Sequence, residues 1–242
     1  MDIIEKLKDD NHYYGKFGKQ FLSNSDIGTL LKNPKMFKKE SIPSLPMLQG
    51  SYFHTMMLEP EKIKDFKVCE ATTRTTKLYK DTISQLDEDI IILQKEVNEI
   101  QKLCEEVKKN VTFNELIYDE NNIFEQPAIS EIGNMMWKGK ADIITPDVIV
   151  DLKTTARIDD FGKSARRYNY DSQAWIYGQL FKKPMLFLVI EKNSARTGLY
   201  DCSDEFLDAG REKVHRALEI YNTFFGESPT EDIDQFFINQ TL

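Results

Sequence analysis

The sequence predicts a mixed α/β fold, in which helices flank one central sheet and the N-terminal part is mainly helical. Four segments in the second half are rich in Ile, Val and Phe, a composition typical of strands. Two segments with helical spacing lie on either side of the last of these strands. The first half carries mostly helical patterns. Strands and helices in this arrangement predict one sheet with helices packed against it.

No Gly/Ser-rich linker interrupts the 242 residues, so we expect one domain over 1–242. It should have four parts. They are a polar, loosely ordered start at 1–20, a mainly helical part at 21–112, an α/β core that carries the chemistry at 113–225, and a C-terminal tail at 226–242.

The composition excludes several classes of protein. Hydrophobic residues make up 40% of the chain, too many for a disordered protein. The longest apolar run, 185–190, is far shorter than the roughly 20 residues that span a bilayer. The start lacks the apolar segment of a secretory signal, and three scattered cysteines exclude a disulfide framework. We therefore expect a cytoplasmic protein.

Three short segments are expected before residue 60. Ser25 or Asp26 caps a helix that stops before Pro34. Residues 41–48 contain two prolines and are expected to form a loop. A second helix should span 50–58 and end near Pro60.

The clearest helical pattern covers residues 84–109. Six apolar residues recur there at alternating spacings of three and four, namely Ile90, Leu93, Val97, Ile100, Cys104 and Val107. Such a seam packs on the core or on one partner helix. A subunit interface is the alternative that the pattern leaves open.

The second half alternates strands and helices. Strands are expected at 122–130, 135–145, 148–154 and 185–192. Helices are expected at 170–181 and 204–225.

The turn Pro146-Asp147 separates two of these strands and sets their register. If the turn centres there, residue 145 pairs with 148, 144 with 149, and 142 with 151. Asp142 and Asp151 then lie opposite each other on one face of the hairpin, and Lys153 points to that face too. The other face is entirely apolar and belongs to the core.

Two carboxylates side by side repel each other unless a cation neutralises them. Oxygen ligands favour Mg²⁺, Mn²⁺ or Ca²⁺ over zinc. A lysine beside such a metal can orient water or stabilise charge on a phosphate. The alternative is a surface ion pair between Asp151 and Lys153 with Asp142 in solvent.

Further polar residues are candidates for the same site. Gln173 and Tyr177 share one face of the 170–181 helix, and Tyr170 lies close to that face. An ordinary polar helix edge would look the same. His54 stands alone in its segment, where a structural role is the commoner one.

Taken together, these features resemble the PD-(D/E)xK nuclease superfamily. In detail they resemble the RecE-like, exonuclease VIII-type enzymes of phages and prophages, which are related to RecB nuclease domains. Five pieces follow in the family's order, namely FLSNSDIGTLLKNPKMFK, GSYFHTMMLEP, ISEIGNMMWKGKADII, VIVDLKTT and YDSQAWIYG. The resemblance covers about residues 21–225 and implies a restriction-endonuclease-like core.

The resemblance also implies roles for single residues. It makes Lys153 the catalytic lysine and Glu131 a glutamate near a second metal ion. The metal ligands it implies are His54, Asp142, Asp151 and the backbone carbonyl of Leu152. Gln173 and Tyr177 would line the site and hold the lysine or the DNA strand.

The reaction implied by the resemblance is metal-dependent hydrolysis of DNA from an end. One or two Mg²⁺ ions would serve, with Mn²⁺ as a substitute. The enzymes it resembles digest linear duplex DNA from 5′ to 3′ and leave a single strand for an annealing partner. Related exonucleases form rings, so a trimeric or tetrameric ring is expected. An iron–sulfur cluster, which related nucleases hold with four cysteines, is not expected with three.

DNA binding requires local positive charge, whereas the net charge is −8. The balance therefore favours a confined basic groove over a basic coat. Candidate DNA contacts are Ser25, Lys35, Lys38, Lys163, Arg166, Arg167 and Tyr170. Lysines outnumber arginines 25 to 7, which suits phosphate contacts better than base reading. The alternatives are an endonuclease or repair nuclease of the same fold, and a non-catalytic DNA-binding or assembly protein.

Overall fold

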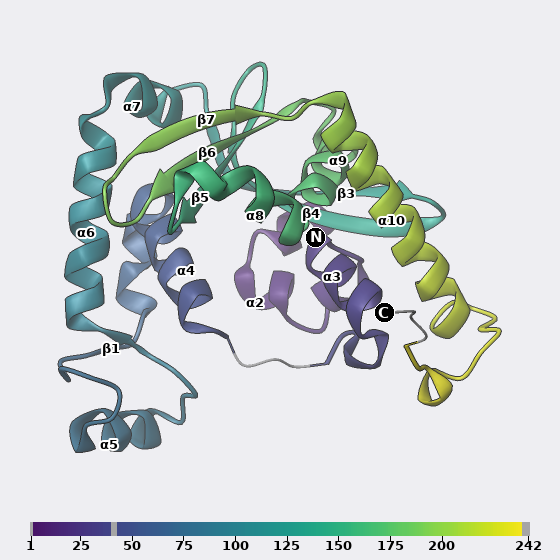
Figure 1. Ribbon diagram of the computed structural model, residues 1–242, viewed down its shortest axis with the longest axis horizontal. Coiled ribbons are helices and arrows are strands. Elements are labelled where there is room, and N and C mark those ends of the chain that lie inside the picture. The colour runs from purple at the N-terminus through teal and green to yellow at the C-terminus, as the bar shows by residue number, and fades with distance from the viewer. Residues whose placement is uncertain (1, 40–42, 239–242) are drawn as a thin grey trace.

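The computed structural model describes residues 2–39 and 43–238 of the chain (Figure 1). Its centre is a five-stranded mixed sheet in the order β3-β4-β5-β6-β7. Within the described part of this sheet, β5 and β6 run parallel and the other neighbouring strands are antiparallel. The strands are β3 Ile123–Ile132, β4 Met135–Ile144, β5 Ile149–Thr155, β6 Met185–Glu191 and β7 Thr197–Asp201. The predicted α/β class is confirmed, and β7, a half-exposed edge strand, was not predicted.

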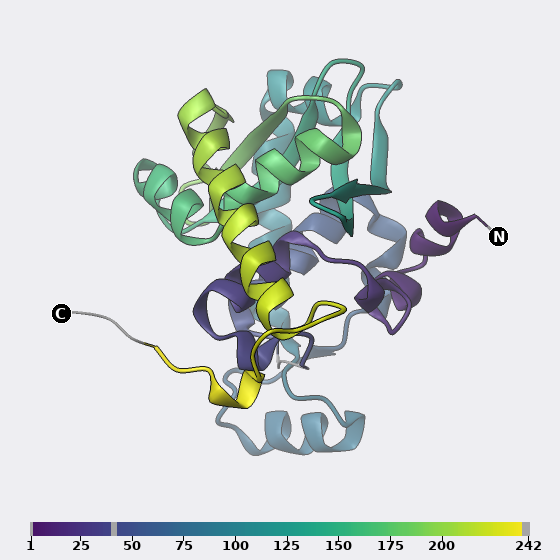
Figure 2. The same cartoon turned by 90° about the vertical axis from the view of Figure 1, so that its right-hand side faces the viewer.

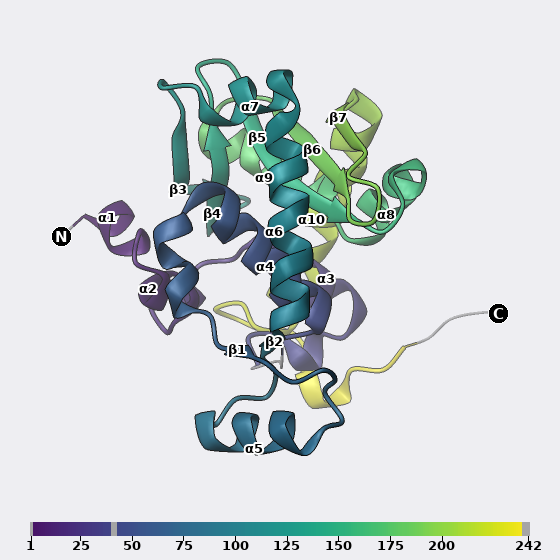
Figure 3. The same ribbon diagram turned by 90° about the vertical axis from the view of Figure 1, so that its left-hand side faces the viewer.

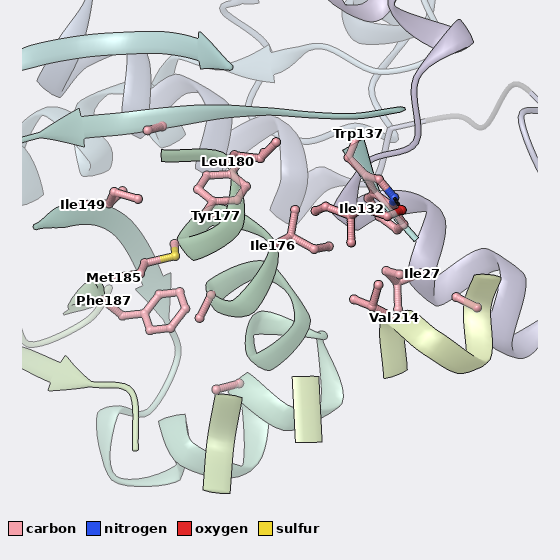
Figure 4. Close-up of a cluster of buried hydrophobic side chains, with 14 of the residues drawn as sticks. Ile27, Ile132, Trp137, Ile149, Ile176, Tyr177, Leu180, Met185, Phe187 and Val214 are labelled. Carbon is pink, nitrogen blue, oxygen red and sulfur yellow. Dashed lines mark hydrogen bonds between the residues drawn. The ribbon is translucent and has the colours of Figure 1, made fainter. Parts of the chain in front are cut away.

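Helices cover both faces of the sheet. Alternate residues of β6 enter different cores, Phe187 and Val189 one and Leu188 and Ile190 the other. The first core includes side chains from α9 and α10, and Figure 4 shows Ile176 among its residues. The second core lies under the helices that precede the sheet in the sequence. Figure 2 shows α10 crossing the outer side of the molecule.

The helices are defined by the following bounds. In chain order they are α1 Ile3–Leu7, α2 Asp10–Tyr14, α3 Asn24–Lys32, α4 Leu45–Leu58, α5 Lys77–Leu86, α6 Gln94–Lys109, α7 Val111–Tyr118, α8 Phe161–Arg167, α9 Tyr170–Phe181 and α10 Asp204–Phe224. A two-stranded parallel sheet joins β1 Val68–Cys69 to β2 Ile92–Leu93. Within the described ranges, none of the helices has both the length and the apolar character to cross a membrane.

The polarity of the N-terminal residues led us to expect a loosely ordered start. Residues 2–20 instead contain α1, α2 and a short 3-10 turn. Leu7 and Tyr13 are buried there against Phe21. Buried apolar side chains therefore pack this polar segment against Ile129 of the sheet.

The expected loop at 41–48 is also shorter than predicted. Helix α4 begins at Leu45 and accepts Pro46 in its first turn, where the missing N–H costs nothing. Residues 41 and 42 lie outside the described residues.

Helix α3 begins two or three residues earlier than predicted. Its cap is Ser23, whose backbone N–H donates to Asp26 Oδ2 at 2.8 Å. The Ser23 hydroxyl donates to the same oxygen at 2.9 Å. Asp26 therefore works from the third helical position.

The single helix expected at 84–109 is two helices. Helix α5 ends at Leu86, Asp87 takes a left-handed conformation with φ of 54°, and β2 intervenes before α6 begins. From Val97 to Val107 the predicted seam is buried in the second core, partly against α4. The apolar face of α6 is therefore covered by other parts of the same chain.

Candidate active site

The predicted hairpin register is observed. Ile143 pairs with Val150 and Ile144 with Ile149, around the Pro146-Asp147 turn. Beyond these pairs β4 and β5 part, so the predicted pair of Asp142 with Asp151 is not formed. Asp142 bridges the opening, because its Oδ2 accepts a hydrogen bond from the backbone N–H of Leu152 at 2.8 Å.

Asp151 is the most buried carboxylate of this opening, with 2% of its surface exposed. Its Oδ1 accepts a hydrogen bond from Gln173 Nε2 at 2.7 Å. Lys153 Nζ lies 2.5 Å from Oδ2 and forms an ion pair with it. Both oxygens of the buried Asp151 carboxylate therefore have a partner in the described residues.

Lys153 lies between the two carboxylates and an aromatic ring. Its Nζ is 4.7 Å from the ring centroid of Tyr170. Burial by itself lowers the pKa of Lys153, but the charges of Asp151 and Asp142 outweigh burial and raise that pKa. The side chain is therefore an ammonium ion held beside Asp151.

The ionisation of Asp151 reflects opposing influences. Burial raises the pKa of the Asp151 carboxyl above its ordinary range. The charge of Lys153 opposes this rise and the charge of Asp142 reinforces it. A buried carboxylate in this state gains from a cation that replaces the lost hydration.

His54 reaches the site from α4, on the other side of the opening. Its Nδ1 lies 3.2 Å from Asp142 Oδ2. Helix α4 contributes Tyr52 and Phe53 to the second core, and these anchors fix the helix face that carries His54.

Glu125 completes an acidic group that the sequence analysis missed. Ligand atoms of His54, Glu125 and Asp142 all lie within 4.8 Å of one another. Glu125 adopts a left-handed conformation with φ of 47°, in β3 between the partners of Ala141 and Ile143. Burial, Asp142 and Glu59 raise the pKa of Glu125 to about 8.

The expected glutamate, Glu131, lies elsewhere. It is exposed and pairs with Met136 near the far end of β3. It does not line the cavity that contains the other site residues. Glu125 could have been predicted from the turn Gly133-Asn134 between β3 and β4. Centring the strand register on this turn places residue 125 opposite residue 142.

These side chains face one cavity of about 580 Å³. It is bounded by α2, α3, α4 and α9 and by strands β3 to β5. Of the residues predicted from the sequence, the cavity is lined by Ser25, His54, Asp142, Asp151, Lys153, Gln173 and Tyr177. It is also lined by unpredicted residues, among them Asp10, Tyr14, Glu125, Lys138 and Lys140.

Two predicted residues take other partners than expected. Gln173 binds Asp151 rather than the lysine. The Tyr177 hydroxyl donates to the backbone carbonyl of Lys140 at 3.0 Å. Tyr177 therefore holds β4 in place while also lining the cavity.

The predicted basic residues divide into two kinds. Lys38 Nζ donates to Asp26 Oδ2 and to the Phe21 carbonyl, so it holds α3 in place. Lys35 Nζ donates to the carbonyl of Asp234 near the C-terminal end of the described chain. The three basic residues of α8, Lys163, Arg166 and Arg167, are exposed and lie outside the cavity lining.

The donor set suits a hard divalent cation. Carboxylate oxygens and one imidazole are ligands of Mg²⁺ and Mn²⁺, and no thiol lines the cavity among the described residues. The residues present therefore fit the metal that the sequence predicts.

Comparison with known proteins gives a family match over most of the chain. Residues 19–228 match the family described as PDDEXK-like domain of unknown function (DUF3799). No curated protein matches the sequence significantly.

Similar folds occur among solved structures. A candidate exonuclease from Eubacterium rectale superposes with a TM-score of 0.64 at 16% identity, covering 97% of this chain and 95% of the other. A phage-related exonuclease from Haemophilus somnus 129PT gives a TM-score of 0.34 at 16% identity, covering 64% and 88%. The first of these shares the overall fold of this chain.

Proposed function

Since the chain belongs to the PDDEXK-like family and has its restriction-endonuclease-like fold, we propose that it is a metal-dependent DNA exonuclease. In this proposal it hydrolyses phosphodiester bonds of linear duplex DNA from an end. The single observation that supports it best is the convergence of Asp142, Asp151 and Lys153 with His54 and Gln173 on one cavity.

The chain's own residues supply positioning and charge. Asp142, Asp151 and His54 would hold a divalent ion, with Glu125 as a further ligand and the Leu152 carbonyl as the resemblance implies. Such an ion would polarise the scissile phosphate and stabilise the charge that develops on it. Gln173 fixes the rotamer of Asp151, and the ammonium of Lys153 stands ready to stabilise the same developing charge.

The finer features of the proposal follow from the RecE-like resemblance. They are Mg²⁺ as the ion, with Mn²⁺ as a substitute, 5′ to 3′ polarity, and a 3′ single strand passed to an annealing protein during phage-type recombination. A trimeric or tetrameric ring in the bacterial cytoplasm belongs to the same proposal. A single domain with its catalytic core at 113–225 is part of the same proposal. Both aspartates of the site lie within that range, on the adjacent strands β4 and β5.

The test compares three DNA substrates with Mg²⁺, namely linear duplex, closed circular duplex and single strands. We expect degradation of linear duplex and no loss of closed circles. Unequal release from 5′-labelled and 3′-labelled ends reports the polarity. The Asp151→Asn variant should be inactive, while Asp147→Asn, in the exposed turn of the same hairpin, should keep wild-type activity.

Other outcomes would decide against the proposal. Nicking or linearisation of closed circles would make the protein an endonuclease. A wild type as inert as Asp151→Asn with both Mg²⁺ and Mn²⁺, but still able to bind DNA, would make it a non-catalytic binding protein.

A further inference from the structure

Two buried lysines lie on the same strand as the first metal-binding aspartate. Lys138, Lys140 and Asp142 alternate along β4, so their side chains share one face. Only 6% of Lys138 and 8% of Lys140 is exposed. Buried lysines are rare unless an anion compensates them.

The anion that compensates Lys140 comes from the N-terminal segment. Asp10 Oδ1 forms an ion pair with Lys140 Nζ, and Asp10 Oδ2 lies 3.1 Å from Lys62 Nζ. One carboxylate thus spans two ammonium groups from separate elements of the fold. Figure 3 shows α2, which carries Asp10, below β3 and β4 in that view.

This carboxylate adds negative charge where a polyanion must enter. The cavity is lined by five acids, Asp10, Glu59, Glu125, Asp142 and Asp151, but by three lysines, Lys138, Lys140 and Lys153. Bound cations would offset the acids at the metal site. Asp10 lies outside the His54, Glu125, Asp142 group, so it would continue to occupy Lys140.

We propose that Lys140 and Lys62 form a binding subsite for a phosphate of the nucleic-acid strand, and that Asp10 occupies it when DNA is absent. A carboxylate and a phosphate present similar paired oxygens to lysine, so one can replace the other. Asp10 has 44% of its side chain exposed and can swing away without unfolding α2. The subsite rests on the proposed function, because Lys140 and Asp10 line the cavity of the metal site and Lys62 contacts Asp10.

The position of the subsite suits a strand that leaves the reacting phosphate. Residues two apart on a strand are about 6.6 Å apart, so Lys140 is one such step from Asp142. A DNA strand whose reacting phosphate lies at Asp142 can therefore place a neighbouring phosphate at Lys140. A purely structural ion pair that only anchors α2 predicts no gain in DNA binding when Asp10 is replaced.

Salt dependence of DNA binding separates the two cases. Binding of labelled single-stranded and duplex DNA is followed by fluorescence anisotropy in EDTA from 50 to 300 mM salt. For Asp10→Asn we expect about five- to tenfold tighter binding at low salt and a slope of log affinity against log salt steeper by about 0.7 to 0.9, as for one added phosphate contact. Adding Lys62→Met to Asp10→Asn should remove most of this gain.

Glu5→Gln is the matched control, because it removes one exposed acid from the same segment outside the cavity. The proposal is overturned if Asp10→Asn binds DNA with the affinity and slope of Glu5→Gln, or if the double variant keeps the gain. Thermal unfolding confirms that each variant is folded.

Wild-type cleavage with Mg²⁺ or Mn²⁺ and wild-type binding distinguish this failure from that of the proposed function. A wild type that binds and cleaves, with no effect of Asp10→Asn beyond that of Glu5→Gln, overturns the subsite alone. A wild type that neither binds nor cleaves DNA overturns both.

Discussion

The carboxylate of Asp151 is held by Gln173 on one oxygen and by Lys153 on the other. Gln173 is itself buried in α9, so it holds the carboxylate in one orientation. Partners of this kind orient a metal ligand without touching the metal, and their loss costs 10- to 100-fold in metal affinity or activity.

Replacing Gln173 with Met should therefore weaken the use of metal. We expect nuclease activity to fall about 10- to 100-fold at low Mg²⁺ and to recover in part at high Mg²⁺. Activity is measured against Mg²⁺ concentration. Gln179→Met changes the same helix away from the cavity and should behave as wild type. An unchanged Mg²⁺ dependence in Gln173→Met would remove Gln173 from this role.

Glu125 predicts how stability depends on pH without metal. Its pKa is raised from 4.5 to about 8 on folding, so the folded state binds the extra proton between these values. Stability is then full below about 4.5 and is lost as the pH rises toward 8, by at most about 1.4 kcal/mol per pH unit for one proton.

The variant Glu125→Gln should lose this dependence. In EDTA, its free energy of unfolding relative to wild type should rise as pH increases from 5 to 8, as measured by urea denaturation. Glu131→Gln lies at the exposed end of the same strand and should follow wild type. Parallel pH profiles for wild type and Glu125→Gln would show that the proton is not held there.

The same two glutamates show what the sequence could predict at this scale. Asp142, Asp151 and Lys153 were found because one tight turn fixes the register of a short hairpin. The Gly133-Asn134 turn, with both residues at positive φ, fixes the neighbouring register and identifies Glu125 equally well. Asp10 could not be found this way, since its partners Lys62 and Lys140 are distant in sequence and share no local pattern.

At the scale of elements, α9 is positioned by the helices around it. Ser172 donates to Asn24 Oδ1 at 2.6 Å, which ties α9 to the start of α3. Lys213 of α10 forms an ion pair with Asp171 at 2.8 Å. Gly210 lies so close that a Cβ there would be 2.1 Å from the Asp171 carbonyl oxygen.

Gly210→Ala should therefore separate α10 from α9. The clash involves backbone on both sides, so we expect a loss of more than about 2 kcal/mol in the free energy of unfolding. Gly162→Ala is the control, because a Cβ in α8 meets open space and should stabilise by about 0.5 to 1 kcal/mol. Equal stabilities by urea denaturation would contradict this close packing.

The elements also show why sequence patterns mislead over longer ranges. The spacing of apolar residues over 84–109 is helical throughout, but Leu93 belongs to β2, which pairs with β1. Pairing with a strand more than twenty residues away overrides a local periodicity. From Tyr170 to Phe181, where both ends of the helix are marked by residues at positive φ, the predicted bounds are confirmed.

At the scale of the whole molecule, the net charge of −8 is partly explained by the cavity. Five acids line it, and three of them come from strands of one sheet. Such a cluster destabilises the folded chain by repulsion unless cations bind it. Part of the negative charge of the molecule would then be neutralised by bound metal ions and would not repel DNA.

Divalent cations should therefore stabilise the folded protein. A ligand at about 100 times its dissociation constant adds about 2.7 kcal/mol to the free energy of unfolding. For a chain of this size that amounts to a melting temperature about 5 to 10 °C higher than in EDTA. Asp151→Asn should lose most of this shift with Mg²⁺ and Mn²⁺, while Asp147→Asn should keep it. Because this measurement needs no DNA and no turnover, an equal shift in both variants would place the metal outside the cavity even if the protein proved to be a nuclease.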